Sequence, residues 1–326
     1  MSDKPKVYVT RKLPQKSLDM IEEECDMEVN SHDRALTRGE LEKAIQGIDG
    51  LLCLLTDNID EDLLKLNPDL QVVANYAVGY DNIDVEACTE KGILVSNTPG
   101  VLTDTTADLA WTLLLATARR VVEADKFTKA GKYEGWSPML LMGGDVYGKK
   151  LGIIGLGRIG KAVVKRAVGG FDMDVVYYDK FRDEEFEKDY DLEYVEFEEL
   201  LETSDFISVH TPLTPETEKM IGEEEFETMK DKAYLINTSR GAVIDEKALL
   251  QALRDDEIAG AGLDVYEDEP KLTPGLVGED NVVLLPHIGS ASVETRTEMA
   301  TMAADNLIAG LKGEKMPNIV NPEALK

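Results

Sequence analysis

The feature that most constrains the fold of this chain is a ten-residue segment near its middle, residues 151–160, which reads LGIIGLGRIG. An apolar run typical of a buried strand leads into Gly155, Gly157 and Gly160, and the residues that follow have the apolar periodicity of a helix. A second apolar run ends at Asp179, nineteen residues after Gly160. A strand, a G-x-G-x-x-G turn, a helix and an acidic residue at this spacing predict a dinucleotide-binding β–α–β unit.

Each glycine of this turn has its own physical reason. Gly155 would form the tight turn, Gly157 would let the backbone approach a pyrophosphate, and Gly160 would let the helix pack closely on the strand. The helix N-terminus, at Arg158 and Ile159, would offer free N–H groups and a partial positive charge to the phosphates. The alternative is an ordinary glycine-rich turn between a strand and a helix. That alternative does not explain the position of Asp179.

Asp179 indicates which dinucleotide is bound. A carboxylate at this place accepts hydrogen bonds from the adenosine ribose and repels a 2′-phosphate, so it favours NAD(H) over NADP(H). Lys180 and Arg182 follow at once. They could pair with a 2′-phosphate or be solvated loop charges, and NADP(H) therefore stays open.

The composition argues against several classes of partner. The chain has 326 residues and a formal net charge of −29, which disfavours nucleic acids and anionic membranes. Its longest apolar run, residues 109–118, is shorter than the roughly 20 residues that span a bilayer. The N-terminus reads directly into a strand, and the three cysteines show neither a metal spacing nor a disulfide framework. We therefore expect a cytoplasmic protein with no metal site.

Alternating strand and helix patterns predict two doubly wound, parallel-sheet α/β domains, a Rossmann cofactor domain and a flavodoxin-like substrate domain. The expected strands are residues 6–10, 27–30, 50–55, 71–78 and 93–97, then 150–155, 174–179, 206–210, 233–239, 259–265 and 281–287. Helices are expected at 15–24, 37–46, 104–120 and about 292–311. The substrate-binding domain would be discontinuous, residues 1–98 and 290–326, and the NAD-binding domain would comprise 99–289. A ligand is expected in the cleft between them.

Three ionisable residues follow predicted strands of the second domain: Arg240, Glu269 and His287. The carboxyl ends of parallel strands share one edge of a sheet, so these side chains should converge. An arginine can clamp a carboxylate and polarise a carbonyl, a histidine can donate a proton, and a glutamate can orient that histidine. Taken singly, each residue has an ordinary alternative as a surface ion pair, a structural histidine or one acid of a loop. Together they suit carbonyl reduction.

These residues carry a resemblance over essentially the whole chain. The sequence resembles the D-isomer-specific 2-hydroxyacid dehydrogenase family. The matching segments are GYDNID at 79–84, the glycine fingerprint, HTPL at 210–213, NTSRG at 237–241, GLDV at 262–265, EP at 269–270 and PH at 286–287. Within the family, VLTDTTA at 101–107 and WSPM at 136–139 are most similar to glyoxylate/hydroxypyruvate reductases.

The resemblance implies a role for each site residue. His287 would donate the proton to the substrate carbonyl, Glu269 would pair with His287, and Arg240 would bind the carbonyl and carboxylate. The backbone N–H groups of Val78 and Gly79 would hold the carboxylate, and Leu55 would line the side-chain pocket. Further cofactor contacts would come from Thr106, His210, Thr211, Pro212, Thr217, Thr238, Ser239, Asp264 and Gly289, with Asp264 reaching the carboxamide. His210 would line the cofactor site without acting as an acid.

The loop at residues 75–79, NYAVG, limits the range of candidate substrates. It lacks the arginine that phosphoglycerate dehydrogenases carry at Asn75 and the lysine that phosphite dehydrogenases carry at Val78. A small 2-oxo acid with an uncharged side group remains, either glyoxylate, hydroxypyruvate or pyruvate. One methylene is worth only about 1–3 kcal/mol in a pocket, so overlapping activities are expected. Other readings are a phosphoglycerate or D-lactate dehydrogenase, a non-catalytic NAD sensor and, remotely, an S-adenosylmethionine enzyme.

The resemblance also implies a homodimer. The helix at 104–120 and the arm at 132–142 are the expected interface.

The net charge of −29 leads to a prediction about salt. If the acidic surface is an adaptation to high salt, melting temperature and activity should both rise between low and molar KCl, because the Debye length falls from about 10 Å at 0.1 M to about 3 Å at 1 M and self-repulsion is screened. Melting curves and NADH oxidation at graded salt measure this. Flat curves would mean an acidic surface of the ordinary kind.

Overall fold

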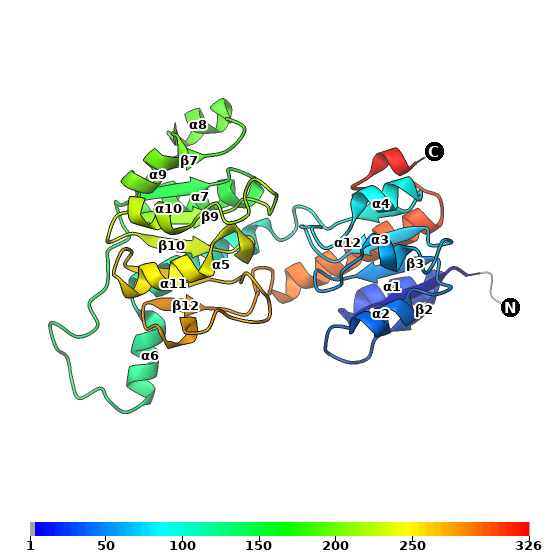
Figure 1. Ribbon diagram of the computed structural model, residues 1–326, viewed down its shortest axis with the longest axis horizontal. Helices are drawn as coiled ribbons and strands as arrows, with labels where there is room; N and C mark the ends of the chain where they lie inside the picture. The colour runs from blue at the N-terminus through cyan, green and yellow to red at the C-terminus, as the bar shows by residue number, and fades with distance from the viewer. Residues whose placement is uncertain (1–3, 326) are drawn as a thin grey trace. The chain divides into compact units, whose positions relative to one another are not determined.

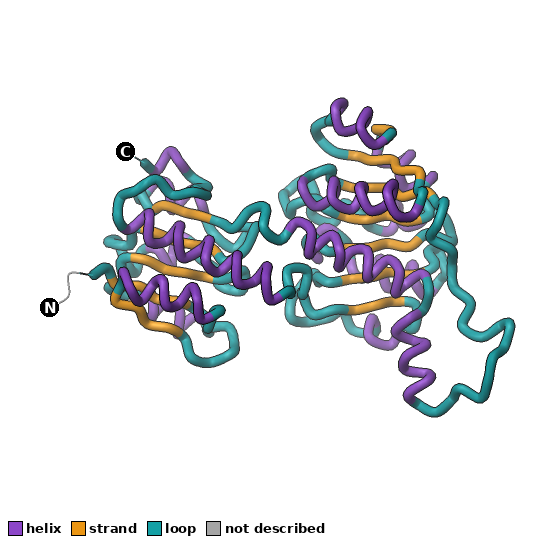
Figure 2. Tube along the Cα trace, turned by 180° about the vertical axis from the view of Figure 1, so that it is seen from behind, coloured by secondary structure: helices purple, strands orange, loops and turns teal. Residues whose placement is uncertain are grey.

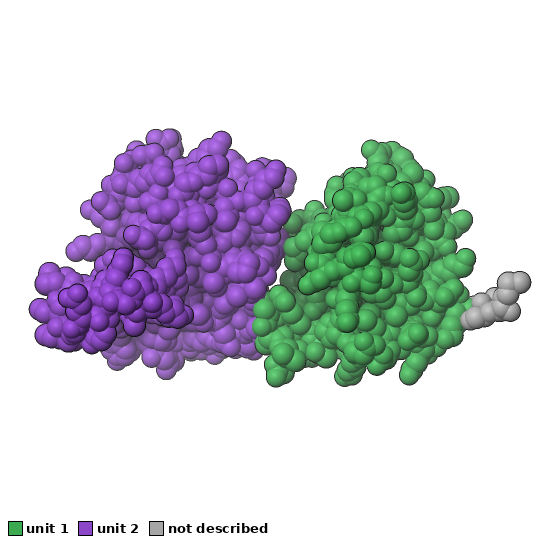
Figure 3. All heavy atoms as spheres, turned by 90° about the horizontal axis from the view of Figure 1, so that it is seen from below, with its two compact units in different colours: residues 1–102, 290–326 green, residues 103–289 purple. Residues whose placement is uncertain are grey.

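The computed structural model describes residues 4–325. Its strands form a five-stranded and a seven-stranded sheet in which every strand pair is parallel. Two compact units follow: unit 1 runs to Leu102 and resumes at Ser290, and unit 2 comprises Thr103–Gly289. Figure 3 colours them separately. The predicted fold class, two parallel-sheet α/β bodies, is confirmed.

Unit 1 is a sheet covered by helices on both faces (Figures 1 and 2). Its strands are β1 Lys6–Val9, β2 Asp26–Val29, β3 Gly50–Cys53, β4 Val72–Asn75 and β5 Leu94–Ser96, in the flavodoxin-like order β2-β1-β3-β4-β5. Its helices are α1 Gln15–Glu24, α2 Arg38–Ala44, α3 Glu61–Leu64, α4 Val85–Glu90 and α12 Val293–Leu311. Alternate strand residues serve the two faces: Leu52 packs with α1 and α12, and Leu51 with α2, α3 and α4.

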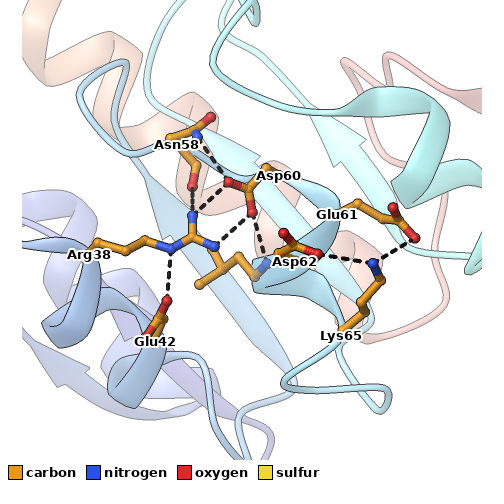
Figure 4. A network of polar contacts seen from close by, with 8 residues as sticks. Arg38, Glu42, Asn58, Asp60, Glu61, Asp62 and Lys65 are labelled. Carbon is orange, nitrogen blue, oxygen red and sulfur yellow. Dashed lines mark hydrogen bonds and ion pairs between the residues drawn. The ribbon is translucent and has the colours of Figure 1, made fainter.

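A polar network on unit 1 fixes where α3 begins (Figure 4). Arg38 of α2 donates to both oxygens of Asp60 at 2.8 Å and to Glu42 at 3.0 Å. The hydrogen bond from Arg38 is the main reason that the pKa of Asp60 lies below its usual value. Asp60 is therefore charged, and it caps α3 by accepting a hydrogen bond from the N–H of Leu63 at 2.8 Å.

The segment after α12 returns to the edge of this sheet. Val320 donates its N–H to the carbonyl of Val95 at 2.7 Å. The side chain of Asn321 accepts from the N–H of Val95 and donates to the carbonyl of Ile93, at 2.8 and 2.9 Å. The returning segment thus satisfies the outer hydrogen-bonding groups of β5, which an edge strand would otherwise leave open.

Unit 2 is a larger sheet of the same kind. Its strands are β6 Lys150–Ile154, β7 Asp174–Tyr178, β8 Glu193–Tyr194, β9 Phe206–Val209, β10 Tyr234–Asn237, β11 Gly260–Leu263 and β12 Val282–Leu284, in the order β12-β11-β10-β9-β6-β7-β8. Its helices are α5 Thr103–Ala118, α6 Val121–Lys129, α7 Arg158–Phe171, α8 Glu184–Tyr190, α9 Phe197–Thr203, α10 Glu223–Thr228 and α11 Glu246–Arg254. The strand order reverses between β6 and β9, which places a topological switch point at the end of β6.

Two details of unit 2 differ from the sequence prediction. The sheet has seven strands rather than six, because β8 is a two-residue edge strand, Glu193–Tyr194, with no apolar run to reveal it. The helix predicted to reach Arg120 ends at Ala118, since Arg120 adopts a left-handed backbone with φ of 52° and α6 then starts a new direction. The helices also bear on whether the chain could span a membrane. Among the described residues, no helix is both long enough and apolar enough to cross a bilayer.

Candidate active site

The glycine turn after β6 is built by steric necessity. Gly155 has φ of 94°, and a Cβ there would lie 2.8 Å from the carbonyl carbon of His210. A Cβ on Gly160 would lie 2.2 Å from the carbonyl oxygen of Gly155. Gly157 differs, because a Cβ there would meet nothing within 4 Å. The first glycine therefore permits the close approach of the segment after β9, the third permits the close packing of α7 on β6 and the turn, and the second faces open space.

Asp179 lies beside this turn. Its Oδ2 accepts a hydrogen bond from the N–H of Leu156 at 2.7 Å, and its Oδ1 accepts one from Phe181 at 3.0 Å. The guanidinium of Arg182 donates to both oxygens of Glu187 at 2.8 Å. This pairing makes Arg182 a structural charge, and the carboxylate of Asp179 is the acidic group at the end of β7.

The segment after β9 carries His210, Thr211 and Pro212. The Nε2 atom of His210 lies 2.8 Å from the hydroxyl of Ser208, and burial lowers the pKa of His210 to about 3. Its ring is therefore neutral over the ordinary pH range. Thr217 fixes the loop that follows, because its hydroxyl donates to the carbonyl of Pro212 at 2.6 Å and accepts from the N–H of Thr214 at 2.8 Å.

His287 and Glu269 form a hydrogen-bonded pair. Nδ1 of His287 lies 2.9 Å from Oε2 of Glu269, and the two side chains are 29% and 30% exposed. Burial raises the pKa of Glu269, but the hydrogen bond from His287 and the charges of His287 and Arg240 outweigh it, so the pKa lies below the usual value. Glu269 is thus a carboxylate at neutral pH. Because a carboxylate can only accept, the proton of this hydrogen bond lies on Nδ1 of His287.

The turn that carries His287 is fixed by its neighbours. His287 has a left-handed backbone with φ of 53°. The N–H of the next residue, Ile288, donates to Oδ1 of Asp264 at 2.8 Å, and the carbonyl of Gly289 accepts from the hydroxyl of Thr106 at 3.2 Å. The ends of β11 and β12 and the start of α5 therefore hold this turn together.

Arg240 stands on a second fixed turn, after β10. The side chain of Asn237 donates to the carbonyl of Arg240 and accepts from the N–H and hydroxyl of Ser239, at 2.8 to 2.9 Å. Gly241 follows, and a Cβ there would lie 1.8 Å from the carbonyl carbon of Tyr266. Because that carbon is backbone, the two turns are in direct contact. Arg240 is close enough for its charge to lower the pKa of Glu269.

The structure thus brings together Arg240, Glu269 and His287, as predicted from their positions after strands. Leu55, Val78 and Gly79 lie in unit 1, after β3 and β4, and Leu55 is 37% exposed. Within residues 4–325 there is no group of three histidine, cysteine, aspartate or glutamate side chains that could hold a metal ion.

Comparisons with known proteins agree with this geometry. Residues 111–289 match the family model described as D-isomer specific 2-hydroxyacid dehydrogenase, NAD binding domain. A curated glyoxylate reductase of Korarchaeum cryptofilum is 53% identical over 99% of this chain and 98% of its own length, and one of Thermococcus litoralis is 52% identical over the same shares. This chain belongs to the D-isomer specific 2-hydroxyacid dehydrogenase family. The resemblance drawn from the sequence is confirmed.

Solved structures are also similar to this dehydrogenase over nearly its whole length. A Thermus thermophilus protein has a TM-score of 0.90 at 45% identity, covering 97% of this chain and 99% of that one. An NADPH-dependent glyoxylate/hydroxypyruvate reductase from Sinorhizobium meliloti, in complex with NADP and malonate, has a TM-score of 0.86 at 32% identity, covering 99% and 98%.

Two features of the dehydrogenase fit a bound nicotinamide dinucleotide. The open side of Gly157, at the start of α7, leaves space for a ligand to approach the backbone. Thr238 Oγ1 and Asp264 Oδ2 are buried, and neither has a hydrogen-bond partner among residues 4–325. Burial raises the pKa of Asp264, which the N–H of Ile288 only partly offsets. Unpaired buried polar atoms are costly, so a ligand that pairs with them gains affinity.

Sequence reasoning missed the residues that hold the site residues in place. Besides Asn237 and Gly241, the buried Glu246 at the start of α11 accepts hydrogen bonds from the N–H groups of Glu267 and Thr273, at 2.6 and 3.3 Å. It thereby braces the loop that carries Glu269. In the sequence, Glu246 stands directly after Asp245, which caps the helix. That position indicates the start of a helix but not a contact with the loop of Glu269.

Proposed function

We propose that this dehydrogenase reduces small 2-oxo acids, glyoxylate and hydroxypyruvate, to the D-2-hydroxy acids with NAD(P)H. The observation that carries the proposal is the His287–Glu269 pair with the charge of Arg240 beside it, in a unit with a dinucleotide turn. The substrate rests on the relatives, which are named glyoxylate reductases at about half identity over nearly the whole chain.

Each residue of the proposed mechanism has one task. A bound nicotinamide supplies the hydride. His287 donates a proton from Nε2 to the carbonyl oxygen, while Glu269 keeps the other ring nitrogen protonated and in place. Arg240 binds the carbonyl and the carboxylate through its planar guanidinium. The N–H groups of Val78 and Gly79 bind the carboxylate.

The remaining assignments follow the same scheme. Leu55 contacts the substrate side group, unit 1 is the substrate-binding domain and unit 2 the NAD-binding domain. Gly155, Gly157 and Gly160 with the start of α7 receive the pyrophosphate, and Asp264 receives the carboxamide. NAD(H) is favoured, because Asp179 directly follows β7 and the nearby Arg182 is paired with Glu187. NADP(H) remains possible, since a structural neighbour is NADPH-dependent.

We further propose a cytoplasmic homodimer. The helix α6 has no buried residue, and the segment after it carries exposed apolar side chains: Tyr133 is 57%, Trp136 84% and Met139 71% exposed. Exposed apolar groups clustered on one segment mark an interaction surface. A second copy of the chain would cover them.

Replacing His287 by alanine should lower kcat for glyoxylate by about 100-fold or more, because general acid catalysis contributes about 10²–10⁴-fold. The Kd for NADH should stay within twofold, since the ring pairs with Glu269 and not with the dinucleotide turn. Stopped-flow oxidation of NADH at 340 nm and fluorescence titration measure the two quantities.

His32→Ala is the matched control for this change, because His32 is exposed in unit 1. It should leave kcat and the NADH Kd unaltered. Near-normal turnover by His287→Ala at neutral pH would contradict the mechanism. A wild-type protein that binds NADH but turns over neither acid would favour the NAD-sensor reading.

Replacing Asp179 by asparagine should reduce the preference for NADH over NADPH about tenfold, because one charge facing a 2′-phosphate is worth ~1–2 kcal/mol. The ratio of kcat/KM for the two cofactors measures it. Asp174→Asn is the control, an exposed carboxylate at the other end of β7. An unchanged ratio in Asp179→Asn would remove this residue from cofactor selection.

The dimer predicts a mass of about twice 36.0 kDa by light scattering. Trp136→Asp combined with Met139→Asp should shift the protein toward the monomer, because two charges would have to be buried. A wild-type monomer at micromolar concentration would reject the interface.

A further inference from the structure

We propose that Asn97 is a positioning residue that aims the N–H of Gly79 at the substrate carboxylate. Residues 77–79 are called the anion loop below. The proposal rests on the proposed function, which gives this loop the carboxylate.

The carbonyl groups of the anion loop are each held by a separate donor. The carbonyl of Ala77 accepts from the N–H of Thr98 at 2.8 Å. The carbonyl of Val78 accepts from the side-chain amide of Asn97 at 2.7 Å, and that of Gly79 from the side-chain amide of Asn75 at 2.9 Å. Three consecutive carbonyls are therefore each fixed by a hydrogen bond.

Fixing these carbonyls also fixes the N–H groups. In a planar trans peptide, the C=O of one residue and the N–H of the next point in opposite directions. Thr98 therefore sets the direction of the N–H of Val78, and Asn97 sets that of Gly79. Among residues 4–325, neither N–H donates to any acceptor, so both are available to an anion.

The absence of cationic side chains from this loop supports a positioning role for Asn97. Residues 75–79 contain no lysine or arginine, so attraction for a carboxylate comes from peptide dipoles, whose effect depends on direction. Val78 and Gly79 together offer one N–H group for each of the two oxygens of a carboxylate. A side chain that controls one of those directions should control affinity for the anion.

Asn97 is itself held by the returning C-terminal segment. Its N–H donates to the carbonyl of Asn318 at 3.3 Å, and its carbonyl accepts from the side chain of Asn306 at 3.4 Å. Asn306 is fully buried in α12 and also accepts from the N–H of Asn318 at 2.9 Å. The backbone of Asn97 is thus tied on both its N–H and its carbonyl to α12 and the segment that follows it.

The test replaces Asn97 by alanine, which removes the donor without adding charge. The probe is oxamate, a non-reducible analogue of a 2-oxo acid, titrated calorimetrically into the protein saturated with NADH. We expect oxamate to bind about tenfold more weakly, as for a lost hydrogen bond that orients a charge-binding group. KM for glyoxylate and hydroxypyruvate should rise by the same factor, with kcat changed less than threefold and the NADH Kd unchanged.

Asn67→Ala is the matched control. Asn67 is buried in unit 1 and donates to the carbonyls of Ile45 and Ile48, at 2.8 and 2.7 Å, away from the anion loop. It should lower the melting temperature without changing oxamate affinity. If Asn97→Ala does not fold, Asn97→Ser serves instead, because a serine hydroxyl is too short to reach the carbonyl of Val78 and should give the same loss.

Oxamate affinity within twofold of wild type in the Asn97 variants would overturn the proposal, as would an equal loss in Asn67→Ala. A wild-type protein with NADH bound that fails to bind oxamate would overturn it too. Failure of the proposed function gives a different result. The wild type would then bind oxamate, and the Asn97 variants would bind it more weakly, but the wild type would turn over neither glyoxylate nor hydroxypyruvate.

Discussion

The constraint on which most of this structure depends is that backbone polar groups need partners where parallel strands end. Inside each sheet the ladder satisfies them, but beyond the last paired residue it does not. In unit 2, Asn237 takes over after β10 and Asp264 after β11, each through side-chain hydrogen bonds to a turn. In unit 1, Asn75 and Asn97 do the same after β4 and β5. The side chains to which we assign the chemistry are carried on turns fixed in this way.

Electrostatics in this protein is local rather than global. A formal net charge of −29 opposes the approach of any anion at long range. Near the proposed site Arg240 supplies a local positive charge, close enough to contribute to the lowered pKa of Glu269. The anion loop adds peptide dipoles without any formal charge. Short-range, directed interactions can therefore select a carboxylate on a strongly acidic protein, because screening by salt weakens the distant repulsion more than contacts in a partly buried site.

The sequence predicts much of the fold, and it places the three proposed catalytic residues after strands of one sheet, because the responsible signals are local. The glycine turn follows from steric rules over six residues, and Arg240, Glu269 and His287 stand at the ends of predicted strands or a few residues after them. The parallel sheets follow from alternating strand and helix periodicity. The edge strand β8 was not predicted, because a strand of two residues is too short to show a periodic pattern.

The supporting residues could not be predicted in the same way. Asn97 bonds to Val78, nineteen positions away, and Glu246 bonds to Glu267, twenty-one positions away. Nothing in the local sequence distinguishes such an asparagine or glutamate from a solvated loop residue or a helix cap. Their partners are set by which strands are neighbours, and that is known only once the chain is folded.

The contact between Gly241 and the backbone of Tyr266 has an evolutionary consequence. Because no side chain separates the two turns, a mutation that shifts either the turn of Arg240 or the loop of Glu269 disturbs the other. Leu55, by contrast, projects from a loop of unit 1 with more than a third of its surface exposed. On the proposed roles, new substrate preferences can arise by drift at Leu55 and its neighbours while the proton-transfer apparatus is inherited intact, so one catalytic core can serve a family of many acids.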